Sequence, residues 1–415
     1  MQAAATAGAA GAVPASAFGS EKAFDPRSWA SVRAQFALNS RETNFSTFLL
    51  ASHPKPVRDA IARHARALDR DAKRYLDAQE YRNAADERVR TAAARYLGVA
   101  SEELAFTDST TMGLGLLYGG LQLAEDDEVV TTTHDFYSTH ESLRLRTLRT
   151  GAHVRRIRLY QNARSASVDE IVSSVRRAIT PKTRALAVTW VHSSTGVKLP
   201  IRAIADAVPP QVLVCVDGVH GSGVEAATSR ELGCDFLVSG CHKWLFGPRG
   251  TGVIWGRAES WNAVTPTIPT FDGRAFQPWM QNVPPDMPRA VAMTPGGFHT
   301  FEHRWALAAA FAFRQRIGRA RAAARTHALA QRLKNGLAEL RRVRLITPQS
   351  TALSAGLVCF EVDGQEPFAV VDRLYARHRI VASVTPYANG YVRLGPSILN
   401  SPAEVDRVIR AVASV

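Results

Sequence analysis

The chain has 415 residues, of which 46% are hydrophobic and 21% charged, and its formal net charge is +14. It is long enough for two domains with substantial cores, and its composition is that of an ordinary soluble protein. Only seven lysines contribute to the positive charge, and the arginines are scattered over predicted helices, so a nucleic-acid partner is not favoured. No run is long and apolar enough to span a membrane, and the four cysteines lack the CxxC spacing of a zinc site or disulfide framework.

Residues 1–19 differ from the rest of the chain. They are small and apolar, they carry no charge, and Ala15-Ser16-Ala17 fits an A-x-A cleavage site. Such a segment is typical of the end of an export signal, here of the twin-arginine type, whose basic region would lie upstream of Met1. The alternative is a disordered Ala/Gly-rich tail. The first interpretation predicts a periplasmic protein and the second a cytoplasmic one.

Between residues 20 and 123 the predicted elements lead to a turn that suits a phosphate group. A mixed segment at 20–50 precedes predicted helices at 56–68 and 84–97, a strand at 104–107 and a helix at 112–123. The turn Asp108-Ser109-Thr110-Thr111 joins the last two elements. Unpaired N–H groups and the helix dipole favour an anion there, although Ser and Thr also begin many helices as simple caps.

From residue 128 to residue 256, strands and helices alternate. Strands are predicted at 128–133, 154–159, 185–191, 212–216, 236–238 and 252–256, and helices at 140–150, 168–179 and 201–207. The strands are short, apolar runs, as strands buried on both faces are. The alternation predicts an α/β fold in which helices cover both faces of a mostly parallel sheet.

An acid and a lysine follow two of these strands. Asp217 closes the strand at 212–216, at the sheet edge where ligands of open α/β sheets bind. Lys243 follows the next strand and lies on a turn, because glycines and a proline come directly after it. Pyridoxal phosphate (PLP) needs this pair, since a lysine binds the cofactor covalently and an acid keeps its pyridine nitrogen protonated.

Beyond residue 260 the pattern changes. Residues 261–297 are rich in proline and aromatic side chains without periodicity, which predicts a long ordered loop or lid. A helical, arginine-rich connection is predicted at 301–340, strands near 356–362 and 391–394, and helices near 368–377 and 402–413. We therefore predict a large domain at 51–315 and a smaller α+β domain at 316–415.

The chain from about residue 45 to its end resembles the class-V branch of the fold-type I PLP-dependent enzymes. This branch includes cysteine desulfurases and isopenicillin-N-epimerase-like proteins. The most specific motifs are DxxH, at Asp217 and His220, and HKWxxGPxGxG, from His242 to Gly252. The resemblance implies a seven-stranded sheet in the large domain, PLP as cofactor and a small-molecule amino substrate. It also implies a homodimer with active sites at the interface.

The resemblance gives roles to seven polar residues. It implies that Lys243 binds the cofactor covalently and that Asp217 pairs with the pyridine nitrogen. His220 and Ser193 match residues near the ring oxygen, whereas His242, Thr110 and Thr111 match residues near the phosphate. For the two histidines, a place in the core or behind the site is the alternative.

The resemblance also implies that Arg393 holds the substrate carboxylate, a role that suits a planar, permanently charged guanidinium. The alternative for this residue is an ordinary solvated arginine. The resemblance thus implies that the catalytic residues are Lys243, His220 and Asp217, and that Arg393 binds the substrate.

Three positions depart from the family pattern. Phe136 stands where the family commonly stacks a histidine on the cofactor ring, and a phenyl ring cannot move protons. No cysteine occurs between residues 335 and 355, where desulfurases carry their catalytic one, and Cys359 is expected to be structural. Phe298 replaces a threonine that often reaches the partner subunit's phosphate, with His299 or Thr300 as substitutes.

A competing motif lies nearby. His299, Glu302 and His303 match the H-x-x-E-H pattern of inverted zinc peptidases, whose two histidines share one helix face. Five residues match easily by chance, so zinc hydrolysis is a remote alternative, and we expect no metal.

The sequence leaves the reaction open. With Lys243 as base at Cα, the same site supports transamination, loss of a Cβ substituent including C–S cleavage, or epimerisation. We expect an aminotransferase acting on an amino acid or a related amine, with a lyase or an epimerase as alternatives.

Overall fold

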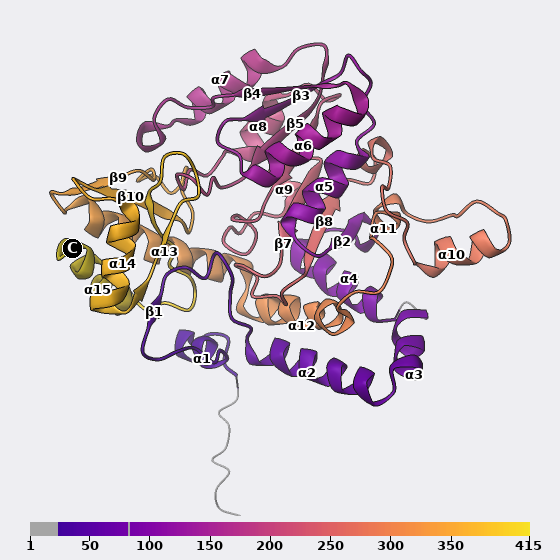
Figure 1. Ribbon diagram of the computed structural model, residues 1–415, viewed down its shortest axis with the longest axis horizontal. Helices are drawn as coiled ribbons and strands as arrows, with labels where there is room; N and C mark the ends of the chain where they lie inside the picture. The colour runs from indigo at the N-terminus through magenta and orange to yellow at the C-terminus, as the bar shows by residue number, and fades with distance from the viewer. Residues whose placement is uncertain (1–23, 82–83) are drawn as a thin grey trace, which may run out of the picture.

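The computed structural model describes residues 24–81 and 84–415. A seven-stranded sheet forms the middle of the larger lobe, with strand order β2-β8-β7-β6-β5-β3-β4 (Figure 1). Its strands are β2 (Leu104–Thr107), β3 (Glu128–Thr132), β4 (His153–Ile157), β5 (Thr183–Thr189), β6 (Leu213–Asp217), β7 (Phe236–Gly240) and β8 (Gly252–Gly256). All neighbours are parallel except β8, which is antiparallel to both β2 and β7. The predicted α/β fold with a mostly parallel sheet is confirmed.

The sheet is buried on both faces, which explains the short apolar runs. On β5, Ala185 and Ala187 belong to one core, and Leu186 and Val188 to the other. The first face is covered by α5 (Thr110–Gly120) and α6 (Tyr137–Thr150). The second is covered by α7 (Val168–Ala178), α8 (Ile201–Ala207), α4 (Ala84–Leu97) and α12 (Phe301–Ile317). Since successive strand residues point to opposite faces, each strand contributes to both cores.

The smaller lobe holds the C-terminal part of the chain (Figure 1). Its sheet has the order β12-β13-β10-β9 and is antiparallel throughout. The strands are β9 (Val343–Leu345), β10 (Val358–Val362), β12 (Ser383–Val384) and β13 (Val392–Leu394), and the helices are α13 (Arg319–Ala338), α14 (Pro367–His378) and α15 (Pro402–Ala413). These elements share one hydrophobic core. The predicted α+β character is confirmed, while the boundary between residues 315 and 316 stays a prediction.

The helical connection predicted at 301–340 is two helices. They meet at Gly318, whose φ of 85° and ψ of 134° lie outside the helical region. A residue with a side chain rarely adopts a φ of this sign, so the glycine permits the break. The sequence pattern alone did not predict it, because helix-forming residues continue on both sides.

The N-terminal segment connects the two lobes. It contains α1 (Trp29–Ala34) and β1 (Thr43–Asn44), and β1 pairs in parallel with β11 (Ile380–Val381). A few residues later the Ala51 N–H donates to the His242 carbonyl at 2.9 Å, next to the predicted site. The chain continues into α2 (Lys55–Arg70), α3 (Ala72–Leu76) and the π-helical turn Asp77–Tyr81. The predictions for residues 1–19 fall outside the described residues.

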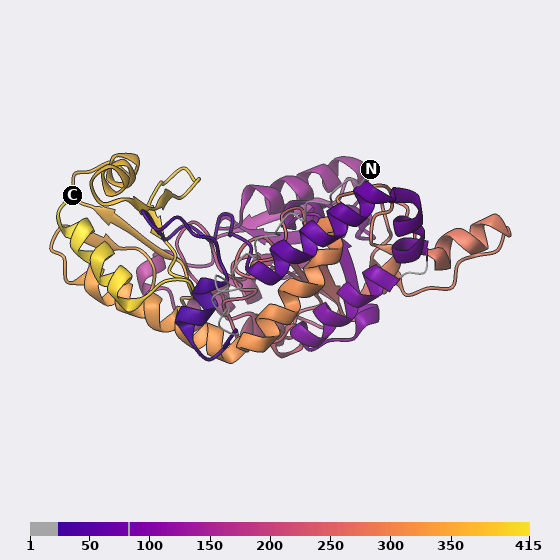
Figure 2. The same ribbon diagram turned by 90° about the horizontal axis from the view of Figure 1, so that it is seen from below.

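The segment predicted as a long ordered loop or lid contains an arm. It contains the short turn Ser260–Ala263 and the helices α10 (Gly273–Met280) and α11 (Arg289–Ala292). In both views α10 projects from the body on the side away from the smaller lobe (Figures 1 and 2). Its proline and aromatic residues build this arm. Within the described part of the chain, no helix is both long and apolar enough to cross a bilayer.

Candidate active site

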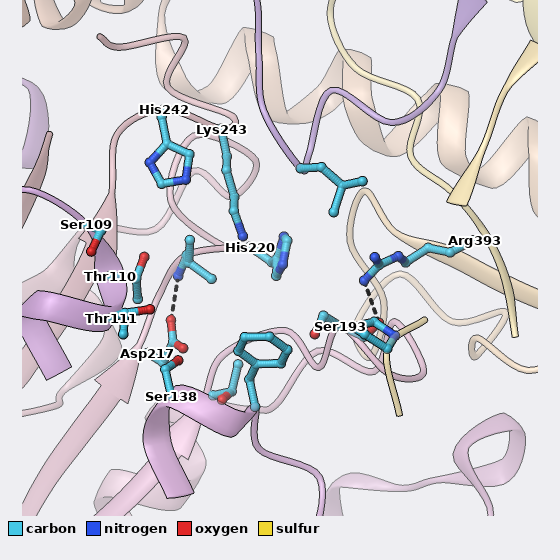
Figure 3. Close-up of a pocket in the computed structure, with 15 residues that line it drawn as sticks. Ser109, Thr110, Thr111, Ser138, Ser193, Asp217, His220, His242, Lys243 and Arg393 are labelled. Atoms are coloured by element: carbon cyan, nitrogen blue, oxygen red, sulfur yellow. Dashed lines mark hydrogen bonds between the residues drawn. The ribbon is translucent and has the colours of Figure 1, made fainter. Parts of the chain in front are cut away.

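One pocket at the carboxyl edge of the large sheet collects every residue predicted for the site. Its lining includes Thr110, Thr111, Phe136, Ser193, Asp217, His220, His242, Lys243 and Arg393 (Figure 3). They come from the start of α5, the start of α6, the loop after β5, the ends of β6 and β7, and β13 of the smaller lobe. Strand register explains the convergence, since Asp217 pairs with Thr189 on one side and Val238 on the other.

Asp217 ends β6 as a buried carboxylate. It is 2% exposed, and its Oδ1 accepts the Val219 N–H at 3.0 Å. Burial raises the pKa of Asp217 to about 6, and the positive charge of Lys243 only partly opposes this effect. A protonated pyridine nitrogen beside the carboxylate would supply the missing counter-charge, so the residue fits the role predicted from the sequence.

Lys243 extends into the pocket between His242 and His220 (Figure 3). The pKa of Lys243 is lowered to about 8, chiefly by burial; the charge of Asp217 opposes this shift and the nearby Arg393 contributes to it. A lysine with this pKa is partly neutral near physiological pH, and the neutral amine is the nucleophilic form. The turn after it is tight, because Phe246 has a φ of 57° and donates its N–H to the Lys243 carbonyl at 3.0 Å.

The start of α5 forms an anion cradle. Ser109 caps the helix by accepting the Met112 N–H at 3.1 Å, and the Thr110 hydroxyl accepts the Gly240 N–H at 2.8 Å. A Cβ at Gly240 would lie 2.9 Å from the Thr110 hydroxyl oxygen and 2.8 Å from Cε1 of His242. Only glycine therefore lets the end of β7, Thr110 and His242 converge on the helix start, where unpaired N–H groups favour a phosphate.

Arg393 is a buried cation without a carboxylate partner among the described residues. It is 3% exposed; its Nε donates to the Ser383 hydroxyl at 3.2 Å and its Nη1 to the Ser193 carbonyl at 3.0 Å. The guanidinium also lies 4.7 Å from the centroid of the Phe48 ring. A buried charge is costly unless it is paired, so this arrangement fits a site for an anionic group such as a carboxylate.

Ser193 does not stand free in the pocket. Its hydroxyl hydrogen-bonds the Tyr387 hydroxyl at 2.7 Å, and the Tyr387 ring meets Phe136 edge-on at 6.0 Å. Sequence reasoning missed Tyr387, which lies in the loop between β12 and β13. Only its nearness in sequence to Arg393 could have suggested it. The pocket lining also includes Ser109 of the predicted phosphate turn, and Leu49, Ser138, Thr189, Val219 and Pro386, none of which was predicted.

The histidine nearest to Phe136 in sequence faces away from the pocket. His134 stacks on Tyr160, with ring centroids 4.0 Å apart, and burial lowers its pKa to about 3. Phe136 is the N-cap residue of α6, and from there its side chain lines the pocket. The pocket therefore has a phenyl ring where the family pattern places a proton-carrying imidazole.

The zinc-peptidase geometry is absent. His299 lies before the first residue of α12, and its Nδ1 hydrogen-bonds the Gly297 carbonyl. His303 lies within α12, and its Nδ1 hydrogen-bonds the Arg249 carbonyl. The two histidines therefore do not share a helix face with Glu302. Over the described residues no group of three or more His, Cys, Asp or Glu side chains could hold a metal ion. The remote alternative of a zinc hydrolase loses its structural basis.

All four cysteines are free and buried. Burial raises the pKa of Cys234, Cys241 and Cys359 to about 12, and that of Cys215 well above its ordinary value. Cys359 lies inside β10, as expected for a structural residue. No described cysteine lines the pocket or is poised to form a thiolate.

The chain is similar to known proteins over most of its length. It is 26% identical to isopenicillin N epimerase of Amycolatopsis lactamdurans over 396 residues, which cover 92% of this chain and 98% of the relative. It is 25% identical to a probable cysteine desulfurase of Vibrio cholerae, over 79% of this chain and 81% of the relative.

Two solved structures share the fold. One is a C-DES variant with glycine covalently linked to its PLP cofactor, with a TM-score of 0.82, 20% identity and coverage of 92% of this chain and 98% of that one. The other is the cysteine desulfurase of Thermococcus onnurineus NA1, with a TM-score of 0.77, 22% identity and coverage of 93% and 97%. The family model for class-V aminotransferases matches residues 51–407. The chain therefore belongs to the class-V aminotransferases, a family of PLP-dependent enzymes.

Proposed function

We propose that the protein is a PLP-dependent aminotransferase for an α-amino acid. One observation carries this proposal: Lys243 shares a pocket with the buried Asp217 and Arg393, and this pocket has no thiol in its lining and a phenyl ring, not a histidine, at position 136. The bound cofactor supplies a ring that accepts negative charge from the substrate Cα. The cofactor would be held by Lys243, Asp217, Thr110, Thr111 and His242.

Three side chains of the protein bind the substrate, hold the cofactor in its protonated form and transfer the Cα proton. Arg393 binds the substrate carboxylate through the guanidinium N–H groups that its bonds to Ser193 and Ser383 leave free. Asp217 would hold the pyridine nitrogen of the cofactor in its protonated form, because its buried carboxylate places a negative charge in the pocket. Lys243 would remove the proton from Cα and deliver it, on the same face, to the cofactor carbon that receives the amino group, a transfer that a single base can perform.

Two alternative reactions, desulfuration through a cysteine and two-base epimerisation, each need a residue that the described pocket does not provide. A desulfurase that stores sulfur on a cysteine needs an accessible thiolate, and the four cysteines of this chain are buried with raised pKa values. An epimerase that uses two bases needs a second proton carrier opposite Lys243. Phe136 cannot act as one, and His134 is held against Tyr160. These absences favour a one-base reaction.

The lining of the pocket favours a substrate with an uncharged side chain. Leu49, Phe136, Val219 and Pro386 contribute apolar surface, and Leu49 remains 46% exposed at the mouth. Arg393 is the one arginine in this lining, so a second carboxylate of a substrate would have no guanidinium of its own in this chain. We therefore propose α-amino acids with apolar side chains as the substrate class.

The reaction type is tested by identifying the products. The PLP-loaded protein, incubated with an apolar amino acid, is expected to release the corresponding 2-oxo acid once per bound cofactor, and an added 2-oxo acid should restart turnover. Release of pyruvate with sulfide or ammonia from cysteine, or inversion at Cα, would contradict the proposal. Mass spectrometry and chiral chromatography distinguish these outcomes.

A variant pair serves as the control for substrate binding. Arg393→Lys loses the planar fork and is expected to raise KM about tenfold or more, because hydrogen bonds to charged groups contribute about 1.5–3 kcal/mol. Arg344→Lys changes an exposed arginine paired with Glu361 and should leave KM unchanged.

We also propose that the protein forms a homodimer. Large apolar side chains are exposed on the arm and the loop that follows it: Phe271 at 58%, Trp279 at 69%, Met280 at 58% and Phe298 at 82%. Exposed clusters of this kind mark protein–protein contacts. Sedimentation should give twice the mass of the 45.2 kDa chain, and Trp279→Asp combined with Phe298→Asp should shift the protein toward monomer. A wild-type protein that sediments as a monomer would contradict this proposal.

A further inference from the structure

The indole of Trp244, the residue after the predicted cofactor lysine, hydrogen-bonds a pocket histidine. Its Nε1–H donates to Nδ1 of His220 at 3.2 Å, and the two side chains are 3% and 4% exposed. An indole nitrogen can only donate, so Nδ1 of His220 must present its lone pair. In the neutral ring the proton is then on Nε2, while the ring itself lines the pocket.

The packing leaves Trp244 little freedom to break this bond. A Cβ at Gly223, whose φ is 87°, would lie 2.8 Å from the Trp244 carbonyl oxygen, so the turn that carries His220 touches the backbone of Trp244. On the other side, a Cβ at Gly356 would lie 2.8 Å from Cη2 of the indole. The Phe48 ring stacks on the indole at 6.2 Å and meets His220 edge-on at 6.3 Å. The indole N–H is thus held toward Nδ1.

The charges around His220 oppose its protonation. Lys243, Arg393 and His242 are the titratable groups that act on it, and each is cationic or becomes so. Burial is the largest cause that lowers the pKa of His220, and these three groups lower it further. A second proton on the ring would also face the Trp244 N–H, since Nδ1 would then carry a hydrogen itself.

We infer that Trp244 is a positioning residue that fixes His220 as the neutral Nε2–H tautomer. His220 then serves the pocket as a hydrogen-bond donor to an anionic oxygen, and it is not available as a base. The catalytic meaning rests on the proposed function, because it leaves Lys243 as the proton acceptor at Cα. The tautomer itself does not depend on the reaction.

Nitrogen NMR of the full-length chain tests the tautomer directly, with and without PLP. The His220 signals are those missing from a ¹⁵N-histidine spectrum of His220→Gln. We expect a proton on Nε2, an accepting Nδ1, and no titration across the neutral pH range. A proton on Nδ1, or a ring that becomes charged in that range, would overturn the inference even if the enzyme proved to be an aminotransferase.

Substitution shows whether Trp244 is the cause. Trp244→Phe keeps an aromatic ring but removes the donor, so His220 should populate both tautomers and take up a proton at a higher pH than in the wild type. The matched control is Trp190→Phe, because Trp190 packs against Gly221 of the same turn and is expected to leave the His220 signals unchanged. Identical His220 spectra in Trp244→Phe and the wild type would refute the role of Trp244.

Activity gives a second readout. Losing one hydrogen bond of this type costs about 0.5–1.5 kcal/mol, so Trp244→Phe is expected to lower kcat/KM up to about tenfold. His220→Gln offers an amide whose oxygen accepts from Trp244 while its nitrogen donates into the pocket. It should therefore lose less activity than His220→Ala, and adding Trp244→Phe to His220→Ala should cost little more. An equal loss in His220→Gln and His220→Ala would contradict the donor role.

Discussion

Lys243→Ala is expected to lower turnover at least about 1,000-fold, within the range that a positioned acid–base group contributes. The substitution removes the only lysine that lines the pocket, and with it both the covalent attachment of PLP and the base at Cα. The protein should still fold, because alanine leaves Asp217 and Arg393 in place and removes a partly desolvated cation. The visible absorption of lysine-bound PLP should disappear together with the activity.

A surface lysine provides the control for this variant. Lys182 pairs with Asp126 at 3.5 Å, and its side chain is 65% exposed, so Lys182→Ala should keep both the absorption and the turnover. Wild-type turnover in Lys243→Ala would rule out the proposed role of Lys243. Loss of both signals in Lys182→Ala would show that lysine substitutions harm the protein in general.

The pKa of Lys243 adds a pH dependence to the same experiment. Burial lowers that pKa to about 8, and only the neutral amine attacks the aldehyde of PLP. The rate at which the cofactor-free wild type takes up PLP should therefore rise with pH and level off above about 8. An ordinary exposed lysine would keep the rate rising for about two further units. Stopped-flow absorption measures the difference.

The sequence predicted the site where local patterns determine the geometry. Strand β6 is an apolar run buried on both faces and closed by one acid, so Asp217 could be placed at the sheet edge before the structure was known. Lys243 follows β7 in the same way, and the glycines after it indicate a turn. The rule that ligands bind at the carboxyl edge of parallel strands then brings the two together.

The contacts that the sequence did not predict join distant parts of the chain. Tyr387 bonds Ser193 across 194 positions, and Phe48 packs against both Arg393 and Trp244. Such contacts depend on how the two lobes pack together, and the hydrophobic periodicity of the sequence does not predict this packing. The direction of the arm at α10 could not be predicted for the same reason, since proline and aromatic residues indicate an irregular segment without giving its direction.

Asp217→Asn is expected to lower kcat on the order of 100- to 1,000-fold. Removing one partner of a buried charge pair costs about 3–5 kcal/mol, and here the partner is the protonated pyridine nitrogen. Asparagine keeps the shape and can still accept the Val219 N–H, so PLP should bind and its absorption should remain. Retained binding with lost turnover separates the electronic role of Asp217 from a structural one.

Although Asp217→Asn should lower kcat, it is expected to raise the stability of the cofactor-free protein. The pKa of Asp217 is raised from 3.8 to about 6 in the folded protein, so the unfolded state holds the ionised carboxylate better. The cofactor-free wild type therefore loses stability as pH rises from about 4 through about 6, and the loss persists above that range. Asp217→Asn removes this cost. Without PLP, it should melt at a higher temperature than the wild type at neutral pH, and the advantage should vanish below about pH 4.

Asp135→Asn is the matched control, because Asp135 is an equally buried acid at 2% exposure. Its carboxylate accepts the N–H groups of Thr132 and Thr189, both at 2.8 Å, and the hydroxyl of Thr131 at 2.9 Å. In asparagine one of the two carboxylate oxygens becomes an NH2 group, which would face an N–H or O–H donor and lose a hydrogen bond. Asp135→Asn should therefore melt at a lower temperature than the wild type. Stabilisation by Asp217→Asn and destabilisation by Asp135→Asn would separate an acid kept for chemistry from one kept for the fold. If Asp217→Asn also melted lower, Asp217 would belong to the structural class, and its assignment to the pyridine nitrogen would lose its physical basis.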